Sequence, residues 1–248
     1  MIGCIIQARM SSERLPGKVL MNIEKNCTIL NSVIDQVMHS NFIEKIVVAT
    51  TTNKIDDKIE EFLKKKKICC FRGEPFDVLD RYYKCAKEYS FSEIVRITSD
   101  NPLIDPKIID LVISEFKEKK IDYACNFFPR TFPQGTETEI FNFSTLQKTW
   151  NEAKKESERE HVTPYIYNNP KKFKISNLEY EKNISHLRWT VDREQDLKFV
   201  QEIKKRINKK PIVLTDILEI LEKNSDLIQI NSNHVVNEGY LKSIKEET

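Results

Sequence analysis

The sequence predicts an α/β fold with three layers, in which helices cover a mostly parallel, mixed sheet. Two observations support this fold class. Short apolar runs rich in β-branched residues alternate along the chain with segments whose apolar residues recur at helical spacing. Polar and charged clusters directly follow the apolar runs, where an open α/β sheet binds ligands at the carboxyl ends of its strands.

Length and composition narrow the choice of protein class. The chain has 248 residues, 40% of them hydrophobic, so we expect one domain over residues 1–248, with residues 208–248 as a small helical extension. The 40 basic and 38 acidic residues nearly cancel, so charge predicts neither a nucleic-acid partner nor a membrane surface. Six cysteines without C-x-x-C spacing, and an amino terminus without signal-peptide features, favour reduced thiols and a cytoplasmic location.

The first predicted strand leads into the most informative loop. Residues 2–6 are apolar and β-branched, and Arg9, Arg14 and Lys18 follow in a polar stretch. The Pro16-Gly17 pair lets the backbone bend sharply just before Lys18. Three cations at this spacing can converge on a polyphosphate, although each could also be an ordinary solvated charge. The Walker A pattern is absent.

The remaining elements follow from the same criteria. Thr28 and Thr215 are predicted N-caps, Asp77 falls in the first turn of a helix, and Lys64–Lys67 fit the solvated end of another helix. Thr50 follows a strand, where its hydroxyl could cap a helix or contact a ligand. We expect further strands at residues 45–50, 68–71, 93–97, 122–126, 136–143 and 187–191, and helices at residues 28–40, 106–119 and 216–223 and from about residues 56, 77 and 194.

Asp100 and Asp192 each follow a predicted strand. A lone aspartate in such a place is usually a turn residue or a helix N-cap. Asp105 and Pro106 already offer a cap for the next helix, which leaves Asp100 for another role, whereas Asp192 could still be a cap. Because Mg²⁺ prefers one or two carboxylates together with phosphate oxygens and waters, a metal ion at Asp100 would need a partner carboxylate.

Charged residues in the second half of the chain leave alternatives open. Glu137 and Glu139 would share one face of a half-exposed strand, where they are either simply solvated, which we favour, or in contact with an acceptor or a metal. His161 can carry a proton near neutral pH, but we favour acceptor binding over acid–base chemistry. The other side chains that could recognise an anion are Arg130, Arg159, His186 and Arg188.

Several stretches resemble the cytidylyltransferases that activate sugars with CTP. Ile5–Lys18 matches the pattern I-I-[PQ]-A-R-x-x-S-x-R-L-P-G-K, and its glutamine variant resembles the spore-coat polysaccharide (SpsF-type) branch rather than the Kdo or sialic-acid branches. Four later stretches also resemble family elements: R-G-x-x-x-D-V-L-D-R-Y from Arg72, [TG]-x-D-x-P-L-[IL] around Asp100, R-E-H-V-T-P-Y from Arg159, and L-R-[WL]-T-V-D-x-x-x-D-L from Leu187. The resemblance covers roughly the first 200 residues.

The resemblance implies a GT-A-like nucleotide-diphospho-sugar transferase fold. It implies transfer of CMP from CTP to a sugar acid or a phosphorylated sugar or polyol, with release of pyrophosphate, for cell-surface polysaccharide or glycoconjugate biosynthesis. Asp100 and Asp192 would hold Mg²⁺ and act in catalysis with Arg14 and Lys18. The implied nucleotide-binding residues are Gln7, Ala8, Arg9, Arg14, Lys18, Thr50, Arg72, Gly73 and Ser99. The implied acceptor-binding residues are Glu137, Arg159, His161, His186 and Arg188.

The family resemblance also implies a homodimer, for which the aromatic-rich region 127–132 offers an apolar patch. Two other functions stay open on the sequence. A GT-A glycosyltransferase would share the fold and the metal carboxylates, but its donor site usually contains a D-x-D element, and none is evident near Asp100. A regulatory module would bind a nucleotide without turnover, and the presence of both candidate carboxylates speaks against it.

Overall fold

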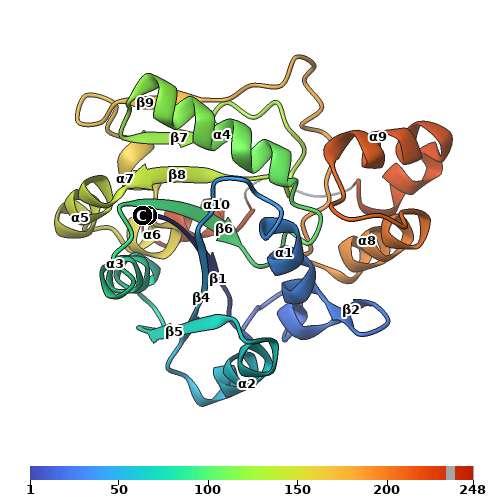
Figure 1. Cartoon of the computed structure of the whole chain (residues 1–248), viewed down its shortest axis with the longest axis horizontal. Coiled ribbons are helices and arrows are strands. Elements are labelled where there is room, and N and C mark those ends of the chain that lie inside the picture. The colour runs from blue at the N-terminus through green and yellow to red at the C-terminus, as the bar shows by residue number, and fades with distance from the viewer. Residues whose placement is uncertain (233–237, 248) are drawn as a thin grey trace.

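Strand β1 (Ile2–Gln7) lies between two parallel neighbours in the main sheet of this computed structural model, which describes residues 1–232 and 238–247. The predicted extension 208–248 therefore falls partly outside the described residues. Within the described part the main sheet has seven strands in the order β5-β4-β1-β6-β8-β7-β9 (Figure 1). Neighbours are parallel except at β8, which runs antiparallel to β6 and β7. The predicted mostly parallel, mixed sheet is confirmed.

Helices and strands alternate along most of the chain, as the sequence predicts. The strands are β1 (Ile2–Gln7), β2 (Asn22–Glu24), β3 (Cys27–Thr28), β4 (Lys45–Thr51), β5 (Cys69–Gly73), β6 (Glu93–Thr98), β7 (Tyr123–Cys125), β8 (Glu139–Asn142) and β9 (Ile175–Asn177). The α-helices are α1 (Ile29–Val37), α2 (Asp57–Lys66), α3 (Val78–Glu88), α4 (Pro106–Lys119), α5 (Phe143–Glu152), α6 (Glu156–His161), α7 (Pro164–Tyr167), α8 (Glu194–Arg206), α9 (Leu214–Lys223) and α10 (Glu238–Glu246). Short 3-10 helices are η1 (Lys18–Leu20), η2 (Lys54–Asp56) and η3 (Ser225–Asn231).

Side chains of the sheet alternate between its two faces, as the period of a strand requires. In β1, Cys4 and Ile6 belong to the core cluster that includes α1, α2, α4, α8 and α9. Ile5 belongs to the cluster on the opposite face, with residues of α3, α5 and α7. Figure 1 shows these three helices on one side of the sheet. Helices therefore cover both faces of the sheet, which confirms the three-layer arrangement.

Most predicted helix caps are present. Thr28, Asp77 and Asp105 each accept a hydrogen bond from a backbone N–H in the first turn of α1, α3 and α4. The prediction that Thr215 is an N-cap is wrong. Helix α9 begins before this residue, and the Asp216 carboxylate accepts a hydrogen bond from the N-cap N–H at 3.0 Å. A carboxylate in the first turn is also stabilised by the positive end of the helix dipole, whereas an uncharged hydroxyl is not.

The expected half-exposed strand over residues 136–143 is shorter and more buried than predicted. Strand β8 lies between β6 and β7, and its Glu139 is almost fully buried. The interpretation of Glu139 as a solvated side chain is therefore wrong, and Glu137, which precedes β8, is only partly exposed. Glu139 accepts a hydrogen bond from Arg96 of the neighbouring strand β6, and Glu137 accepts one from Arg130. Such pairing lets a carboxylate occupy the interior of a sheet.

The segment 187–191 does not join the sheet as a strand, so this part of the prediction is wrong. Within the described residues its one β-bridge joins it to Gln134. The Val191 N–H instead donates a hydrogen bond to the Asp100 carbonyl at 2.8 Å. The segment thus crosses the loop that follows β6 and brings Asp192 beside Asp100.

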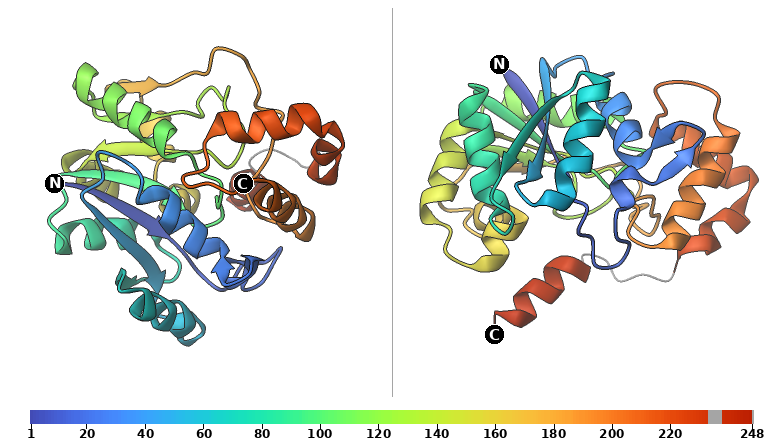
Figure 2. Two further views of the ribbon diagram at one scale, coloured as in Figure 1. Left: turned by 45° about the vertical axis from the view of Figure 1, so that its right-hand side comes forward. Right: turned by 90° about the horizontal axis from the view of Figure 1, so that it is seen from below.

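The last described helix, α10, lies away from α9 and packs against α6 (Figure 2). Among the described residues, no helix combines the length and the hydropathy that a membrane span needs. The six cysteines are free thiols, four of them buried, as expected for reduced core residues.

Candidate active site

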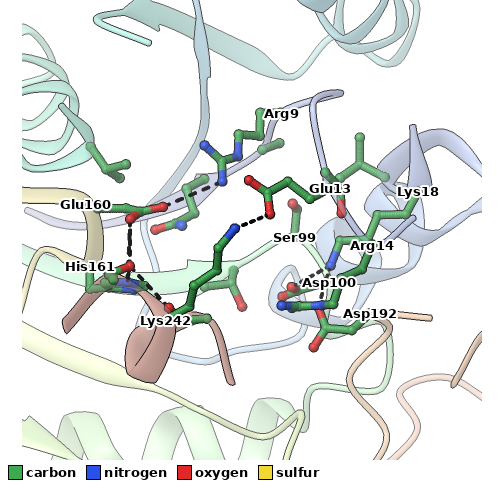
Figure 3. A pocket seen from close by; sticks show the side chains of 18 of the residues that line it. Arg9, Glu13, Arg14, Lys18, Ser99, Asp100, Glu160, His161, Asp192 and Lys242 are labelled. Carbon is green, nitrogen blue, oxygen red and sulfur yellow. Dashed lines mark hydrogen bonds and ion pairs between the residues drawn. The ribbon is translucent and has the colours of Figure 1, made fainter. Parts of the chain in front are cut away.

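Two adjoining cavities open at the carboxyl ends of β1 and β6. The first cavity has a volume of about 340 Å³ and lies against the loop that follows β1 (Figure 3). The second cavity has a volume of about 240 Å³ and is bordered by residues of β6 and β8. The residues that line both cavities are Arg14, Thr98, Asp100, His161, Asp192 and Gly239. Two ligands bound in the two cavities would therefore meet at this shared wall.

The Lys18 ammonium joins the two aspartates of the shared wall. Its Nζ donates hydrogen bonds to Asp100 Oδ2 and Asp192 Oδ1, both at 2.9 Å, and to the Val191 carbonyl at 2.7 Å. The Lys18 side chain is only 9% exposed. Burial lowers the pKa of this ammonium, but the charges of Asp100 and Asp192 outweigh that effect and raise the pKa above its usual value. Lys18 is therefore a charged group at neutral pH.

The position of Lys18 depends on the turn before it. Gly17 has a φ of 72°, in the left-handed region that favours glycine, and its N–H donates a hydrogen bond to the Met10 carbonyl at 2.8 Å. This bond closes the loop after β1, and η1 then begins at Lys18 with its side chain directed into the protein. The bend that the Pro16-Gly17 pair predicts is thus what directs the lysine inward.

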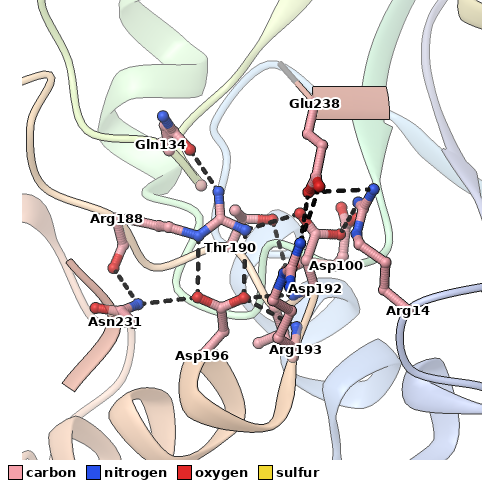
Figure 4. A network of polar contacts seen from close by, with 12 residues as sticks. Arg14, Asp100, Gln134, Arg188, Thr190, Asp192, Arg193, Asp196, Asn231 and Glu238 are labelled. Atoms are coloured by element: carbon pink, nitrogen blue, oxygen red, sulfur yellow. Dashed lines mark hydrogen bonds and ion pairs between the residues drawn. The ribbon is translucent and has the colours of Figure 1, made fainter. Parts of the chain in front are cut away.

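Asp192 is surrounded by cations. Its Oδ1 accepts hydrogen bonds from Lys18 and from Arg14 Nη2, the latter at 2.7 Å, and its Oδ2 accepts one from Arg188 Nη2 at 2.8 Å (Figure 4). Burial raises the pKa of this carboxyl, but Lys18 and Arg14 lower it more strongly, so the pKa lies well below its usual range. Asp192 is not the N-cap of α8, because Arg193 holds that position and the hydrogen bonds to the Asp192 carboxylate come from the three cationic side chains.

Arginine–carboxylate pairs and aromatic rings line the second cavity. Arg96 pairs with Glu139 and Arg130 pairs with Glu137, and all four side chains border the cavity. The aromatic side chains of its lining are Phe127, Tyr167 and Tyr240. The cavity therefore offers donors, acceptors and apolar ring faces together, a surface suited to a small polar molecule.

His161 lies between the two cavities. Its Nε2 shares a hydrogen bond with Ser243 Oγ at 3.0 Å, and the Tyr240 ring meets it edge-on with the ring centroids 5.2 Å apart. Burial lowers the pKa of His161, and the neighbouring Glu160 raises it by less. The imidazole is therefore mainly neutral at pH 7, where it can donate a hydrogen bond to a ligand in either cavity or accept one from it.

Most of the residues that the sequence singles out line one of the cavities. Those in the first cavity are Gln7, Ala8, Arg9, Arg14, Lys18, Ser99, Asp100, His161 and Asp192, and those in the second include Arg130, Glu137, His161 and Arg188. Residues more than 170 positions apart in the chain are thus brought together, as in the contact between Lys18 and Asp192.

Five of the predicted site residues line neither cavity. Thr50 is fully buried, and Gly73 ends strand β5. Arg72 is bound to two carboxylates of α2, and Arg159 is bound to the carboxylate that caps α3. His186 is exposed on the surface. The two arginines hold neighbouring helix ends in this structure, a role that the sequence pattern alone does not separate from ligand binding.

Several lining residues were not predicted. Arg81 borders the first cavity with only 2% of its surface exposed; it donates a hydrogen bond to a backbone carbonyl, and its Nε has no partner among the described residues. Arg96 borders the second cavity, and a signal for it existed, since it is a charged residue inside an apolar strand. Glu160 and Lys242 also border the first cavity. For Lys242, near the C-terminus, no motif gave a signal.

Comparison with known proteins agrees with this fold. The structure of a cytidylyltransferase from Leptospira borgpetersenii matches with a TM-score of 0.88 and 37% identity, covering 96% of this chain and 99% of that one. The fold is thus that of the nucleotide-diphospho-sugar transferases, as expected. The spore coat polysaccharide biosynthesis protein SpsF of Bacillus subtilis is 32% identical, over 90% of this chain and 94% of its own length. An uncharacterised protein of Methanocaldococcus jannaschii is 38% identical, over 92% of this chain and 93% of its own length.

The family model for cytidylyltransferases matches residues 3–242 of the chain. The chain therefore belongs to the cytidylyltransferase family and is an enzyme of the nucleotidyltransferase class. This membership does not favour the alternative of a GT-A glycosyltransferase.

Proposed function

We propose that this enzyme transfers CMP from CTP to a small anionic acceptor, a sugar acid or a phosphorylated sugar or polyol, and releases pyrophosphate. The observation that carries the proposal is the shared wall, because Arg14, Asp100 and Asp192 border both cavities. A nucleotide in the first cavity and an acceptor in the second would expose the reacting atoms to the same side chains. Membership of the cytidylyltransferase family supports CTP, and the name of the B. subtilis relative supports a pathway of polysaccharide or glycoconjugate synthesis.

Arg14 and Lys18 are the proposed partners of the triphosphate. Both are bound to Asp192 in the structure, so an entering polyphosphate competes with this carboxylate for them. Arg9 borders the same cavity and is more exposed, which makes it available to the outer phosphates. Fixed positive charges next to the leaving pyrophosphate stabilise the charge that develops on it, so these residues act by position and electrostatics rather than by covalent attack.

Asp100 and Asp192 are the proposed Mg²⁺ ligands. The donor set fits this ion: one carboxylate follows strand β6, the other follows the segment 187–191, and both approach one point, the Lys18 ammonium. Mg²⁺ is commonly bound by one or two carboxylates and completes its coordination with phosphate oxygens and water. When bound, the ion would neutralise charge on the α-phosphate. Lys18 already shows that this point stabilises a positive charge.

The second cavity is the proposed acceptor site. Arg188, Glu137 and His161 border it, which supports the role that the sequence suggests for them, and Arg130 adds a further cation. Because the imidazole of His161 is mainly neutral at pH 7, we assign it to acceptor binding and not to acid catalysis. The predicted roles of Arg159 and His186 receive no support from geometry, since neither residue borders the cavity.

A thermal-shift titration tests the proposal without knowledge of the acceptor. A ligand that binds only the folded state raises Tm by mass action. We expect CTP to raise Tm more than UTP, ATP, GTP or nucleotide sugars, and Mg²⁺ to increase the effect of CTP. A pyrophosphate-release screen of sugar acids and phosphorylated sugars then identifies the acceptor. A response to a UDP-sugar or GDP-sugar with none to CTP would reject the proposal in favour of a glycosyltransferase.

The homodimer and the cytoplasmic location also stay predictions. Phe128 is 52% exposed and its ring stacks on Tyr167 with centroids 5.0 Å apart, which supports an apolar contact surface in the region 127–132. Light scattering of the purified protein would give the mass of a dimer if this surface pairs with a second copy. The mass of a monomer at all concentrations would contradict it.

A further inference from the structure

Helix α10 borders both cavities although it follows every motif in the sequence. Its residues that line the first cavity are Gly239, Lys242, Ser243 and Glu246, and those that line the second are Glu238, Gly239 and Tyr240. In Figure 3 the Lys242 side chain extends from this helix toward the loop that follows β1. The C-terminal helix is thus part of the cavity wall.

Polar contacts hold α10 in this place. Glu238 accepts two hydrogen bonds from Arg193 Nη2, at 2.9 and 3.0 Å, and Ser243 Oγ bonds to His161. None of the helix residues is fully buried, and Leu241 is 45% exposed. A helix that belongs to the core buries an apolar stripe, and α10 does not. The position of α10 therefore presents polar side chains to the two cavities.

Lys242 is the cation that α10 brings to the first cavity. Its Nζ donates a hydrogen bond to Glu13 Oε2 at 2.7 Å, and Glu246 lies 3.8 Å away. The Lys242 and Glu13 side chains are 54% and 78% exposed. An ion pair that is so exposed contributes little free energy, so a phosphate can replace the carboxylate at small cost.

The loop cations border the same space. Arg9, Arg14 and Lys242 line one cavity of about 340 Å³, and Glu13 lies on the loop between the two arginines. A polyphosphate held by Arg9 and Arg14 would therefore have the Lys242 ammonium within the same cavity, on the α10 side of the ligand. Phosphate oxygens bind several cations at once, and each charge-assisted contact strengthens binding.

We propose that Lys242 is a phosphate-binding residue of the nucleotide site and that α10 completes this site. The inference rests on the proposed function, which supplies the triphosphate as the ligand. It adds a residue that is 229 positions from its present partner Glu13 and that belongs to no motif.

Isothermal titration calorimetry with CTP, in the presence and absence of Mg²⁺, tests the inference on the full chain. Lys242→Gln should weaken CTP binding by about fivefold to tenfold, the range for a partly exposed charge-assisted contact. Lys242→Arg should retain most of the affinity. Lys245→Gln is the matched control, because it removes the same charge from the same helix at a position that lines neither cavity, and it should bind CTP as the wild type does.

A second variant separates phosphate binding from simple docking of α10. Glu13→Gln breaks the same ion pair but leaves the Lys242 ammonium in place. If Lys242 binds phosphate, Glu13→Gln should bind CTP at least as tightly as the wild type. If Lys242 only docks the helix, Glu13→Gln and Lys242→Gln should lose affinity equally, and that result would overturn the inference.

The outcomes also separate this inference from the proposed function. Wild-type protein that binds CTP while Lys242→Gln binds it equally well would overturn the role of Lys242 alone. Wild-type protein that binds no nucleoside triphosphate would overturn both. Titration with CMP adds a further check, because the loss caused by Lys242→Gln should be smaller for CMP than for CTP if the ammonium contacts the outer phosphates.

Discussion

Two arginines, one from each cavity, differ in how deeply their carboxylate partners are buried. In the second cavity, the side chains of Arg96 and Glu139 are 11% and 2% exposed. In the first cavity, the side chains of Arg9 and Glu160 are 45% and 39% exposed, and their charged atoms are 3.7 Å apart. The same kind of ion pair therefore lies in two very different environments within one site.

This difference indicates how each cavity binds its ligand. Exposed ion pairs contribute about 0–1 kcal/mol, so the first cavity can give Arg9 and Lys242 to a polyphosphate at small cost, whereas Lys18 is buried beside its two aspartates. Buried pairs leave an uncompensated charge when one partner is removed, so Arg96 and Glu139 remain bound to each other when a ligand enters. On the proposed function, the second cavity would therefore recognise its acceptor with a fixed surface of donors and acceptors, and the exchange of ion-pair partners would take place in the first.

The largest expected effect concerns the wall that the two cavities share. Asp100→Asn should lower kcat by about a thousandfold, because the variant loses a carboxylate charge that faces both cavities and that we propose as a Mg²⁺ ligand. Tm should change little, since the amide can still accept a hydrogen bond from Lys18. Pyrophosphate release measures the rate, and Asp226→Asn, an exposed aspartate that lines neither cavity, is the control. An active Asp100→Asn enzyme would refute the role proposed for this aspartate.

The second prediction tests the difference in burial directly. Arg96→Met should lower the free energy of unfolding by about 3–5 kcal/mol, because it leaves the Glu139 charge buried without a cation. Arg9→Met, its counterpart in the first cavity, should change it by less than about 0.5 kcal/mol. The double variant Arg96→Met with Glu139→Leu should recover part of the loss. Urea unfolding gives all the values, and equal losses for Arg96→Met and Arg9→Met would contradict the comparison.

The sequence predicted the first cavity far better than the second. The loop from Arg9 to Lys18 follows one strand and matches one continuous motif, so its cations could be assigned together. The residues of the second cavity come from β6, β8, the loops near them, α6, α7, the segment 188–192 and α10, and only the folded sheet places Arg96 opposite Glu139. Alternating polar residues predicted a solvated face for Glu139 because periodicity reports which side chains share a face, and not what covers that face.

Local rules also failed where tertiary contacts compete with them. The pattern at 187–191 predicts a strand, but the segment bonds to the Asp100 carbonyl and to Gln134 instead of joining a neighbouring strand. The contribution of α10 was not predictable, because no local pattern links Lys242 to a loop at the other end of the chain.

A third prediction uses the depressed pKa of Asp192. Because its pKa is lower in the folded state than the value of about 3.9 in an unfolded chain, Asp192 stabilises the fold above that pH and loses this effect as the pH falls toward the folded pKa. Asp192→Asn should therefore cost about 1–3 kcal/mol of unfolding free energy at pH 7 and less at pH 3. Urea unfolding at pH 7, 5 and 3 measures the difference, and a cost that does not shrink at low pH would contradict this assignment.

The smallest expected effect concerns Arg72 and Arg159, which the family resemblance places in the site and which line neither cavity. Arg72 is bound to Asp57 and Glu60 at 2.6 and 2.7 Å, so Arg72→Gln should change KM for CTP by less than about twofold. Arg14→Gln, measured beside it, should raise KM for CTP severalfold because Arg14 is one of the residues of the shared wall. A similar rise for Arg72→Gln would mean that the nucleotide extends past the first cavity to the end of β5. The ion pairs that open for the nucleotide would then include those of Arg72 with the carboxylates of α2. The difference between exposed and buried ion pairs would in that case not coincide with the difference between the two cavities.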